Sequence, residues 1–279
     1  MSYRFRWGIL IQTLNAKEKT GRFWLRSLGT GDGAPCGDRN HSAYLYCLDG
    51  ANILIDCGES VCRSFKASGL SWDTIDQIIL SHFHSDHFGG FFLLMQGMWL
   101  EKRRKRLPVA MPQDGLAPFR QMLDLGMIFD ELLEFQLTFE ALRLGQPVQI
   151  GQARVTPYLT THLEGLRKQF QKAHPLAFEA FCFLLESGPV RAGHSADLGS
   201  PTDLAPLLAQ PLDLLVCELA HFHPEDLFEY LKDHVVRHLV LTHLGRPQRK
   251  RLDEIRRNVA RILPGWRVTF AEDQDLIEI

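Results

Sequence analysis

The chain has 279 residues, of which 45% are hydrophobic and 23% charged, and its 31 Lys+Arg against 33 Asp+Glu give a formal net charge of −2. This is the composition of a globular protein with a sizeable core, and it excludes intrinsic disorder, collagen-like repeats and a small disulfide-stapled fold. The near-neutral balance argues against electrostatic steering of the whole protein to nucleic acid, although a local basic patch is left open.

The first half of the chain alternates short apolar runs with helical patterns. A turn signal at Asp49-Gly50 joins two apolar runs and predicts a strand pair. Glycine and proline end the helical patterns. In chain order we predict strands at Tyr44–Leu48 and Ile53–Asp56, a helix at Val61–Ser68, a strand at Gln77–Ser81, and helices at Phe91–Lys105, Asp114–Met127 and Phe129–Phe135.

The second half repeats the alternation of strands and helices. Glycine turns within Leu142–Thr161 predict an antiparallel meander. Sheets covered by outer layers of helices fit this order. The further predicted elements are strands at Phe178–Glu186 and Leu212–Cys217, a helix at Pro224–Asp233, a strand at Arg237–Thr242, a helix at Arg249–Ile262 and a strand at Arg267–Ala271.

The cysteines and the N-terminus bear on the compartment. The cysteines form no CxxC pair, and we interpret them as reduced and buried, as expected in the cytoplasm: Cys36, Cys47, Cys57, Cys62, Cys182 and Cys217. The apolar run in the N-terminal MSYRFRWGILIQ is too short for a signal sequence, and no stretch is long enough for a membrane span. We therefore expect a cytoplasmic protein without a membrane partner.

The strongest chemical signal is the segment His82–His87, with the sequence HFHSDH. It follows the apolar strand Gln77–Ser81. Two histidines at i and i+2 on an extended segment project the same way, and the turn after them can aim Asp86 and His87 at a second point. Imidazole and carboxylate suit zinc, manganese or iron.

One short motif cannot complete two coordination spheres, so more distant ligands are needed. His162, Asp197 and His243 each come just after an apolar β run. A single residue of this kind is usually an ordinary turn residue. Three of them beside the histidine cluster indicate further metal ligands.

The segment HFHSDH matches the HxHxDH motif of the metallo-β-lactamase superfamily, and the three distant ligands follow in that family's order. The likeness covers Leu28–Leu244. Three blocks near its start resemble the opening of the ribonuclease Z and phosphodiesterase branch: LGTGDGAP at Leu28–Pro35, RNHSAYLY at Arg39–Tyr46 and LIDCGES at Leu54–Ser60.

The resemblance implies an α/β fold, an αββα four-layer sandwich forming a single domain over residues 1–279, with metals at one edge of the two sheets. Carried over residue by residue, it assigns one metal to His82, His84 and His162, the other to Asp86, His87 and His243, and a bridging position to Asp197. Asp86 is assigned a catalytic role as well. Diiron oxidoreductases of the superfamily resemble HxExD, so a histidine at position 84 favours hydrolysis.

This ligand set predicts two divalent metal ions, with zinc expected and manganese or iron as alternatives. Two such ions share a water, lower its pKa toward neutrality and supply a metal-bridging hydroxide. They also neutralise charge on a phosphoryl oxygen during attack. A phosphodiester gains from both effects, so we expect a phosphodiesterase acting on a small or nucleotide-like substrate.

The leaving alkoxide of a phosphodiester needs a proton. In the ribonuclease Z branch a histidine before the last ligand strand supplies it, and His221 resembles that residue in its spacing to His243. We assign His221 as the proton donor. His223 is the rival, although Pro224 beside it is typical of a helix start.

The chain departs from ribonuclease Z between His162 and Asp197. Members of that family resemble one another in a long tRNA-gripping arm at this point, whereas here the interval is 35 residues and contains a needed strand. We therefore expect neither tRNA maturation nor a large RNA partner. The basic run Lys102–Arg106 is interpreted as a solvated helix end. The sequence leaves a homodimer open.

Two other functions use the same residues. One is hydrolysis of a lactone, thioester or lactam. The other is binding of a metal or ligand without turnover, against which the complete set of seven ligands argues.

Overall fold

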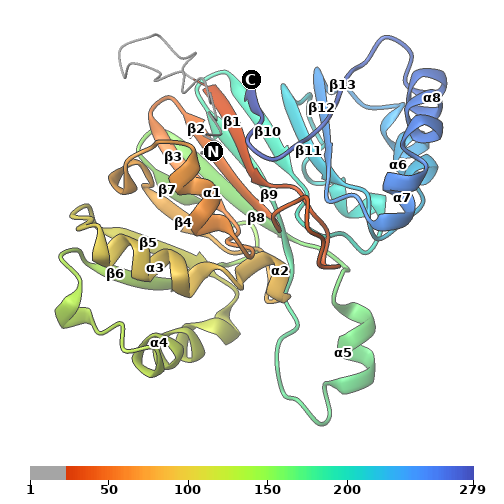
Figure 1. Cartoon of the computed structure of the whole chain (residues 1–279). Helices are drawn as coiled ribbons and strands as arrows, with labels where there is room; N and C mark the ends of the chain where they lie inside the picture. The colour runs from red at the N-terminus through yellow and green to blue at the C-terminus, as the bar shows by residue number, and fades with distance from the viewer. Residues whose placement is uncertain (1–22) are drawn as a thin grey trace, which may run out of the picture.

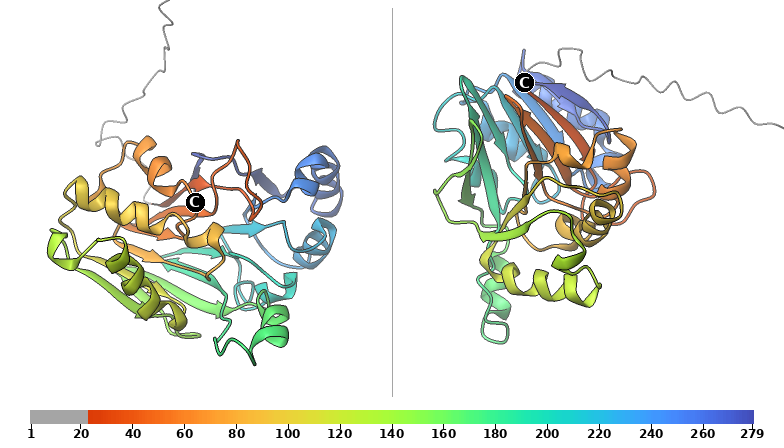
Figure 2. Two further views of the ribbon diagram at one scale, coloured as in Figure 1. Left: turned by 60° about the horizontal axis from the view of Figure 1, so that its bottom comes forward. Right: turned by 90° about the vertical axis from the view of Figure 1, so that its left-hand side faces the viewer.

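Two seven-stranded sheets pack face to face in the computed structural model, which describes residues 23–279 (Figures 1 and 2). Helices cover the outer faces, so the predicted α/β four-layer sandwich is confirmed. The first sheet has the order β14-β1-β2-β3-β4-β5-β6, and the second has the order β13-β12-β11-β10-β9-β8-β7. The C-terminal β14 joins the edge of the sheet built by the first half of the chain.

The strands are short and mostly apolar. Those of the first sheet, in chain order, are β1 (Phe23–Gly29), β2 (Ala43–Leu48), β3 (Ala51–Ile55), β4 (Gln77–Ile79), β5 (Leu107–Met111), β6 (Leu137–Ala141) and β14 (Leu276–Glu278). Those of the second sheet are β7 (Val148–Ile150), β8 (Ala153–Leu159), β9 (Phe181–Ser187), β10 (Val190–His194), β11 (Leu214–Glu218), β12 (His238–Thr242) and β13 (Arg267–Phe270).

Alternation along the central strands divides the apolar side chains between the layers. In β3, Ile53 and Ile55 point between the two sheets, whereas Leu54 packs on the helix side. In β12, Val240 lies between the sheets and Leu239 faces the helices of the other outer layer. Strands buried on both faces read as continuous apolar runs, which is why the sequence revealed them.

The outer layers come from opposite halves of the chain (Figure 1). Helices α1 (Val61–Ala67), α3 (Phe91–Leu100) and α4 (Leu116–Leu125) cover the first sheet. Helices α6 (Pro224–Leu231) and α8 (Leu252–Ile262) cover the second sheet, and α7 (Arg246–Lys250) precedes α8. Short 3-10 helices lie at η1 (Trp72–Thr74), η2 (Gln113–Gly115), η3 (Asp130–Leu132) and η4 (Pro201–Leu204).

Two predicted elements need correction, and several strands were not predicted. The helix predicted at Phe129–Phe135 is only the short η3. The predicted meander Leu142–Thr161 contains one hairpin, β7–β8, because its first residues cross from one sheet to the other. Strands β1, β5, β6 and β14 were not predicted; β5 contains a proline and β14 has only three residues.

The basic run Lys102–Arg106 lies beyond the end of α3, and it is solvated except at Arg103. Helix α3 ends at Leu100, and Lys102 has a left-handed φ of 62°. The Arg103 side chain is 1% exposed, and its guanidinium donates hydrogen bonds to the carbonyl oxygens of Trp72 and Ile75. The guanidinium donates a third hydrogen bond, to the carbonyl oxygen of Arg106. Arg103 therefore holds this loop together, because burial of its aliphatic stem and these three hydrogen bonds outweigh the solvation of its charge.

A short projection leaves the body of the molecule between β8 and β9. It contains helix α5 (Glu164–Phe170) and extends away from both sheets (Figures 1 and 2). The sequence predicted no such helix in the interval from His162 to Asp197. We call residues 163–179 the projection.

The remaining predictions about compartment are tested in part. No helix within residues 23–279 is long and apolar enough to cross a membrane. All of the predicted cysteines are free, but Cys36 and Cys62 are only half-buried. The N-terminal apolar run lies outside the described residues, and one domain over 1–279 stays a prediction.

Candidate metal centre

The seven predicted ligands converge at one edge of the sandwich, just beyond strand ends. His82 and His84 follow β4, and Asp86 and His87 lie on the short helix α2 (Ser85–Phe88). The other three follow β8, β10 and β12: His162, Asp197 and His243. These strands run in the same direction within the second sheet, so their carboxyl ends meet at one edge.

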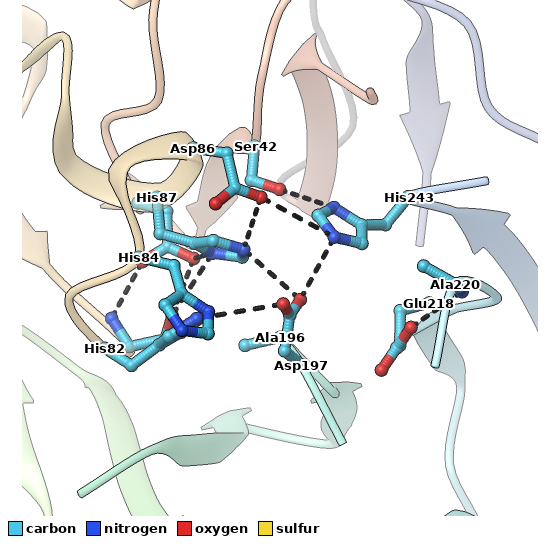
Figure 3. Close-up of polar contacts among 12 residues, drawn as sticks. Ser42, His82, His84, Asp86, His87, Ala196, Asp197, Glu218, Ala220 and His243 are labelled. Carbon is cyan, nitrogen blue, oxygen red and sulfur yellow. Dashed lines mark hydrogen bonds and ion pairs between the residues drawn. The ribbon is translucent and has the colours of Figure 1, made fainter. Parts of the chain in front are cut away.

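Asp197 occupies the centre of this group (Figure 3). Its Oδ2 lies 3.7 Å from His82 Nε2 and 3.6 Å from His162 Nε2. Its Oδ1 lies 3.2 Å from His87 Nε2 and 3.4 Å from His243 Nε2. One carboxylate thus presents each of its two oxygens to a different pair of imidazoles.

The ligand atoms form two clusters that share Asp197. The first contains His82, His84, His162 and Asp197, and the second contains Asp86, His87, Asp197 and His243. In each cluster the donor atoms lie within 4.8 Å of one another. In the first, His84 Nδ1 lies 3.0 Å from His162 Nε2. In the second, Asp86 Oδ2 lies 3.3 Å from His87 Nε2 and 3.7 Å from His243 Nε2.

Unpartnered buried atoms test whether these clusters fit metal ions. Within the described chain, His82 Nε2, His87 Nε2 and Asp197 Oδ1 are buried and lack a hydrogen-bond partner. Buried polar atoms are nearly always paired, so such a concentration calls for a missing partner. Imidazole nitrogens and carboxylate oxygens around a common centre are a donor set for a divalent cation.

The histidine rings are fixed from behind by hydrogen bonds. His87 Nδ1 lies 2.6 Å from Asp56 Oδ2, and the same carboxylate accepts hydrogen bonds from Ser81 N and Ser81 Oγ. Ser81 Oγ also lies 3.0 Å from His82 Nδ1. On the other side, Ser42 Oγ lies 3.0 Å from His243 Nδ1. Such contacts set the tautomer and leave Nε2 directed inward.

The backbone around the centre is held in unusual conformations. Asp56, Ala196 and His243 have left-handed φ values of 61°, 45° and 50°. Such conformations are costly for residues other than glycine and cluster at functional sites. Close approach also matters at Gly58, where a Cβ would lie 2.2 Å from the carbonyl oxygen of Asp86. This region of the LIDCGES block therefore supports the helix that carries Asp86 and His87.

Burial sets the charge state of the first cluster. Burial, and to a lesser extent the neighbouring imidazoles, hold the pKa of His82 well below its ordinary value. Burial also lowers the pKa of His84. Burial also lowers the pKa of His162 to about 4. These rings are neutral near pH 7, which is the form that binds a metal. Burial opposes the charge on Asp197, but His243 and His87 outweigh it and hold the pKa of this carboxyl well below its usual range.

His221 lies at the open side of the centre, whereas His223 does not. His221 Nε2 is 3.8 Å from Asp197 Oδ2, and its Nδ1 lies 2.8 Å from Glu218 Oε1. Glu218 is 1% exposed and also accepts hydrogen bonds from the backbone of the same loop. His223 is exposed at the start of α6. Of the two candidates, only His221 is brought to the ligands.

The charge of His221 follows from this pairing. Burial disfavours the imidazolium form, but the hydrogen bond and the negative charge of Glu218 outweigh burial and raise the pKa of His221 to about 9. His221 is therefore protonated at neutral pH, with Nδ1 engaged and Nε2 directed at the centre.

Several of the supporting residues were not assigned from the sequence. Ser42 lies inside the RNHSAYLY block and Ser81 directly precedes the histidine motif, so both were in segments that had already drawn attention. Their contacts depend on long-range packing, because Ser42 and His243 are 201 positions apart. Adjacency to a ligand motif was the only available signal.

The fold and the ligand arrangement define the class of protein. The metallo-β-lactamase fold protein YhfI from Bacillus subtilis superposes with a TM-score of 0.72 at 19% identity, over 92% of this chain and 99% of that one. That likeness shows a metallo-β-lactamase fold. The family model described as "Anti-Pycsar protein Apyc1" matches residues 23–252, and the chain belongs to this family.

Curated relatives point to a neighbouring group. Ribonuclease Z of Methanopyrus kandleri is 33% identical over 138 residues, which are 50% of this chain and 46% of that protein. The chain thus matches about half the length of this relative. Ribonuclease Z of Methanothermobacter thermautotrophicus is 25% identical over 298 residues, covering 90% of this chain and 95% of the relative. The predicted resemblance to the ribonuclease Z branch is confirmed.

Proposed function

We propose that the chain is a dinuclear metal-dependent hydrolase that cleaves phosphodiesters of small, nucleotide-like substrates. The observation that carries this proposal is the position of Asp197, whose two oxygens face separate imidazole pairs while protonated His221 lies beside it. The relatives named ribonuclease Z support phosphodiester chemistry.

The residues would hold the metals as two sites that share one carboxylate. His82, His84 and His162 would hold one ion, Asp86, His87 and His243 the other, and Asp197 would bridge them. Two such ions supply an activated water near neutral pH and neutralise charge on the phosphoryl oxygens. The nitrogen and oxygen donors favour zinc, with manganese or iron as alternatives.

The chain itself supplies the proton for the leaving group. His221 would donate from Nε2 to the departing oxygen, while Glu218 keeps Nδ1 engaged and the ring oriented. Asp86 would act at the opposite side. Its Oδ2 faces His87 and His243, so its remaining lone pairs are placed to orient the attacking water.

The interval between His162 and Asp197 argues for a small substrate. It contains the projection and the strands β9 and β10, which are neighbours in the middle of the second sheet. In the basic run Lys102–Arg106, which could have contacted RNA, the Arg103 side chain is buried and hydrogen-bonded to backbone carbonyl oxygens. Large RNA is therefore not the proposed substrate, and a homodimer stays a prediction.

The experiment compares three substrate classes on zinc-loaded protein. We expect turnover of bis(4-nitrophenyl) phosphate and none of a lactone or a thioester at matched concentration. Turnover of the carbonyl substrates alone would contradict the proposal and favour the lactone or thioester function. Metal uptake without turnover of any of them would indicate a binding protein.

A further inference from the structure

Three buried hydrogen bonds cross the space between the two sheets behind the metal centre. On the first sheet they start from alternate positions along β2 and the residue before it, where the side chains point toward the second sheet. The pairs are Ser42 Oγ with His243 Nδ1 at 3.0 Å, Tyr44 Oη with Thr242 Oγ1 at 2.7 Å, and Tyr46 Oη with His194 Nδ1 at 2.9 Å. On the second sheet these bonds reach the ends of β10 and β12, just before or at the ligands that follow those strands.

The pair Tyr46 and His194 lies in an otherwise apolar layer. Tyr46 is 0% exposed and His194 is 1% exposed, and residues such as Ile53, Phe183 and Val216 form the same inter-sheet core. A buried hydrogen bond adds little net stability, and two apolar side chains of similar shape are about as stable. Stability alone therefore does not explain this pair. A fully paired buried polar group also fixes one arrangement of the core, and that property does explain it.

His194 belongs to the segment that carries Asp197. It is the last residue of β10, and the bridging carboxylate follows three positions later. Between them, Ser195 N donates to the carbonyl oxygen of Val216, and Ser195 Oγ accepts from Glu218 N. The segment is thus tied to its own sheet through β11 and to the opposite sheet through Tyr46.

The second nitrogen of His194 lies on the side of the ligands. His194 Nε2 is buried and has no hydrogen-bond partner within residues 23–279. The ring lines a cavity of about 10 Å³, which is the space of one water, and Asp197 and His243 line the same cavity. Burial lowers the pKa of His194 to about 3, so the ring adds no positive charge behind the metal ligands.

We propose that Tyr46 and His194 are positioning residues that hold Asp197 at the distance from the first sheet that two metal ions require. This inference rests on the metal centre of the proposed function and not on its substrate. His82 and His87 come from the first sheet and Asp197 comes from the second. Their separations of 3.7 and 3.2 Å therefore exist at only one arrangement of the two sheets. The bond from Tyr46 to His194 fixes that arrangement three residues from the carboxylate.

Tyr46→Phe is the first test, because it removes one hydroxyl and keeps the ring. Asp197 belongs to both clusters, so we expect zinc affinity, measured by competition with a chelator, to fall about tenfold. The visible absorption bands of the cobalt-substituted protein should also change, because they report the coordination geometry. Tyr230→Phe removes the same group from α6, outside the inter-sheet layer, and should change neither. Wild-type zinc affinity and an unchanged cobalt spectrum in Tyr46→Phe would overturn the proposal.

The double variant Tyr46→Phe/His194→Leu separates positioning from stability. It removes both polar partners, so the free energy of unfolding of the metal-free protein, measured with urea, should return from the lower value of Tyr46→Phe to near that of the wild type. Zinc affinity should stay reduced, because the link between the sheets is still absent. Zinc affinity that recovers together with stability would show that the pair only supports the core. If the double variant does not fold, Tyr46→Phe and its cobalt spectrum decide the question.

These measurements are independent of turnover. Wild-type protein that binds two zinc ions but hydrolyses no phosphodiester would contradict the proposed function alone, and a lower zinc affinity in Tyr46→Phe would still support the positioning role. Wild-type protein that binds a single zinc ion would contradict both.

Discussion

The first sheet provides its site residues from one continuous loop, whereas the second sheet provides them from separate loops. His82–His87 follows β4 directly, and its rings are tied to Asp56 and Ser81 behind them. The residues after β8, β10, β11 and β12 come together only when those strands pair. The second side also includes His221, whose side chain is 34% exposed, while His82 and His87 are buried.

This difference suggests a division of roles. We propose that the loop after β4, whose histidines are buried and hydrogen-bonded from behind, fixes the metal geometry. The more open loops of the second sheet would present the bridging carboxylate and the proton donor to substrate. Substitutions that affect the loop after β4 should therefore reduce metal affinity. Substitutions of the exposed residue His221 in the second sheet's loops should reduce turnover while the metals are retained.

Asp197→Ala removes the carboxylate that both ligand clusters share. We expect kcat/KM for a phosphodiester to fall by more than about 10³-fold, because the loss of an outer partner alone costs about 10–100-fold in such sites. Metal content by mass spectrometry should fall as well, while circular dichroism stays that of the folded protein. Two bound metals with near-normal turnover would show that Asp197 does not bridge.

His221→Ala tests the proposed proton donor of the second sheet. Loss of a proton donor typically costs about 10²–10⁴-fold. The loss should be large for an alkyl phosphodiester and small for a 4-nitrophenyl ester, whose leaving group departs without a proton. Metal content should be unchanged, and His223→Ala is the matched control that should retain activity. Equal losses on both substrates would make His221 a positioning residue.

Asp56→Asn tests the hydrogen bonds behind the loop that follows β4. The asparagine fits the same space but removes the charge that orients His87 and accepts from Ser81. We expect metal affinity, measured by competition with a chelator, to fall by about 10–100-fold. At saturating metal, kcat should largely recover. A loss of kcat at full metal occupancy would contradict the proposal that Asp56 acts only through metal binding.

The pH dependence of turnover gives the smallest effect. In the proposed mechanism His221 acts in its protonated form, and Glu218 raises the pKa of His221 to about 9 against the opposing effect of burial. The donor is therefore present below that pH and is lost as the pH rises through it. For an alkyl diester we expect kcat to decline by about tenfold per pH unit above the pKa, with no such limb in His221→Ala.

The sequence predicted which candidate ligands come together because their signals are local. The histidine motif is contiguous, and the distant ligands each end an apolar strand, so the shared sheet edge brings them together. Arg103 shows the limit of such reasoning. Four neighbouring basic residues indicated a solvated run, but Arg103 is buried because its guanidinium binds the carbonyl oxygens of Trp72 and Ile75.

The supporting contacts could not be predicted in the same way. Ser42 reaches His243 and Tyr46 reaches His194 across the two sheets. Both depend on tertiary closure rather than on periodicity. The short helix α5 lacked a buried face, which is the feature that makes helices visible in a sequence.

If the Asp197 carboxylate joins two metal sites, the protein binds two metal ions per chain, and the metal stoichiometry reports this number. Protein saturated with zinc, freed of excess metal and measured by inductively coupled plasma mass spectrometry should contain two equivalents per chain. His243→Ala, which alters only the second cluster, should contain one. Wild-type protein that never exceeds one equivalent under saturating zinc would contradict the account.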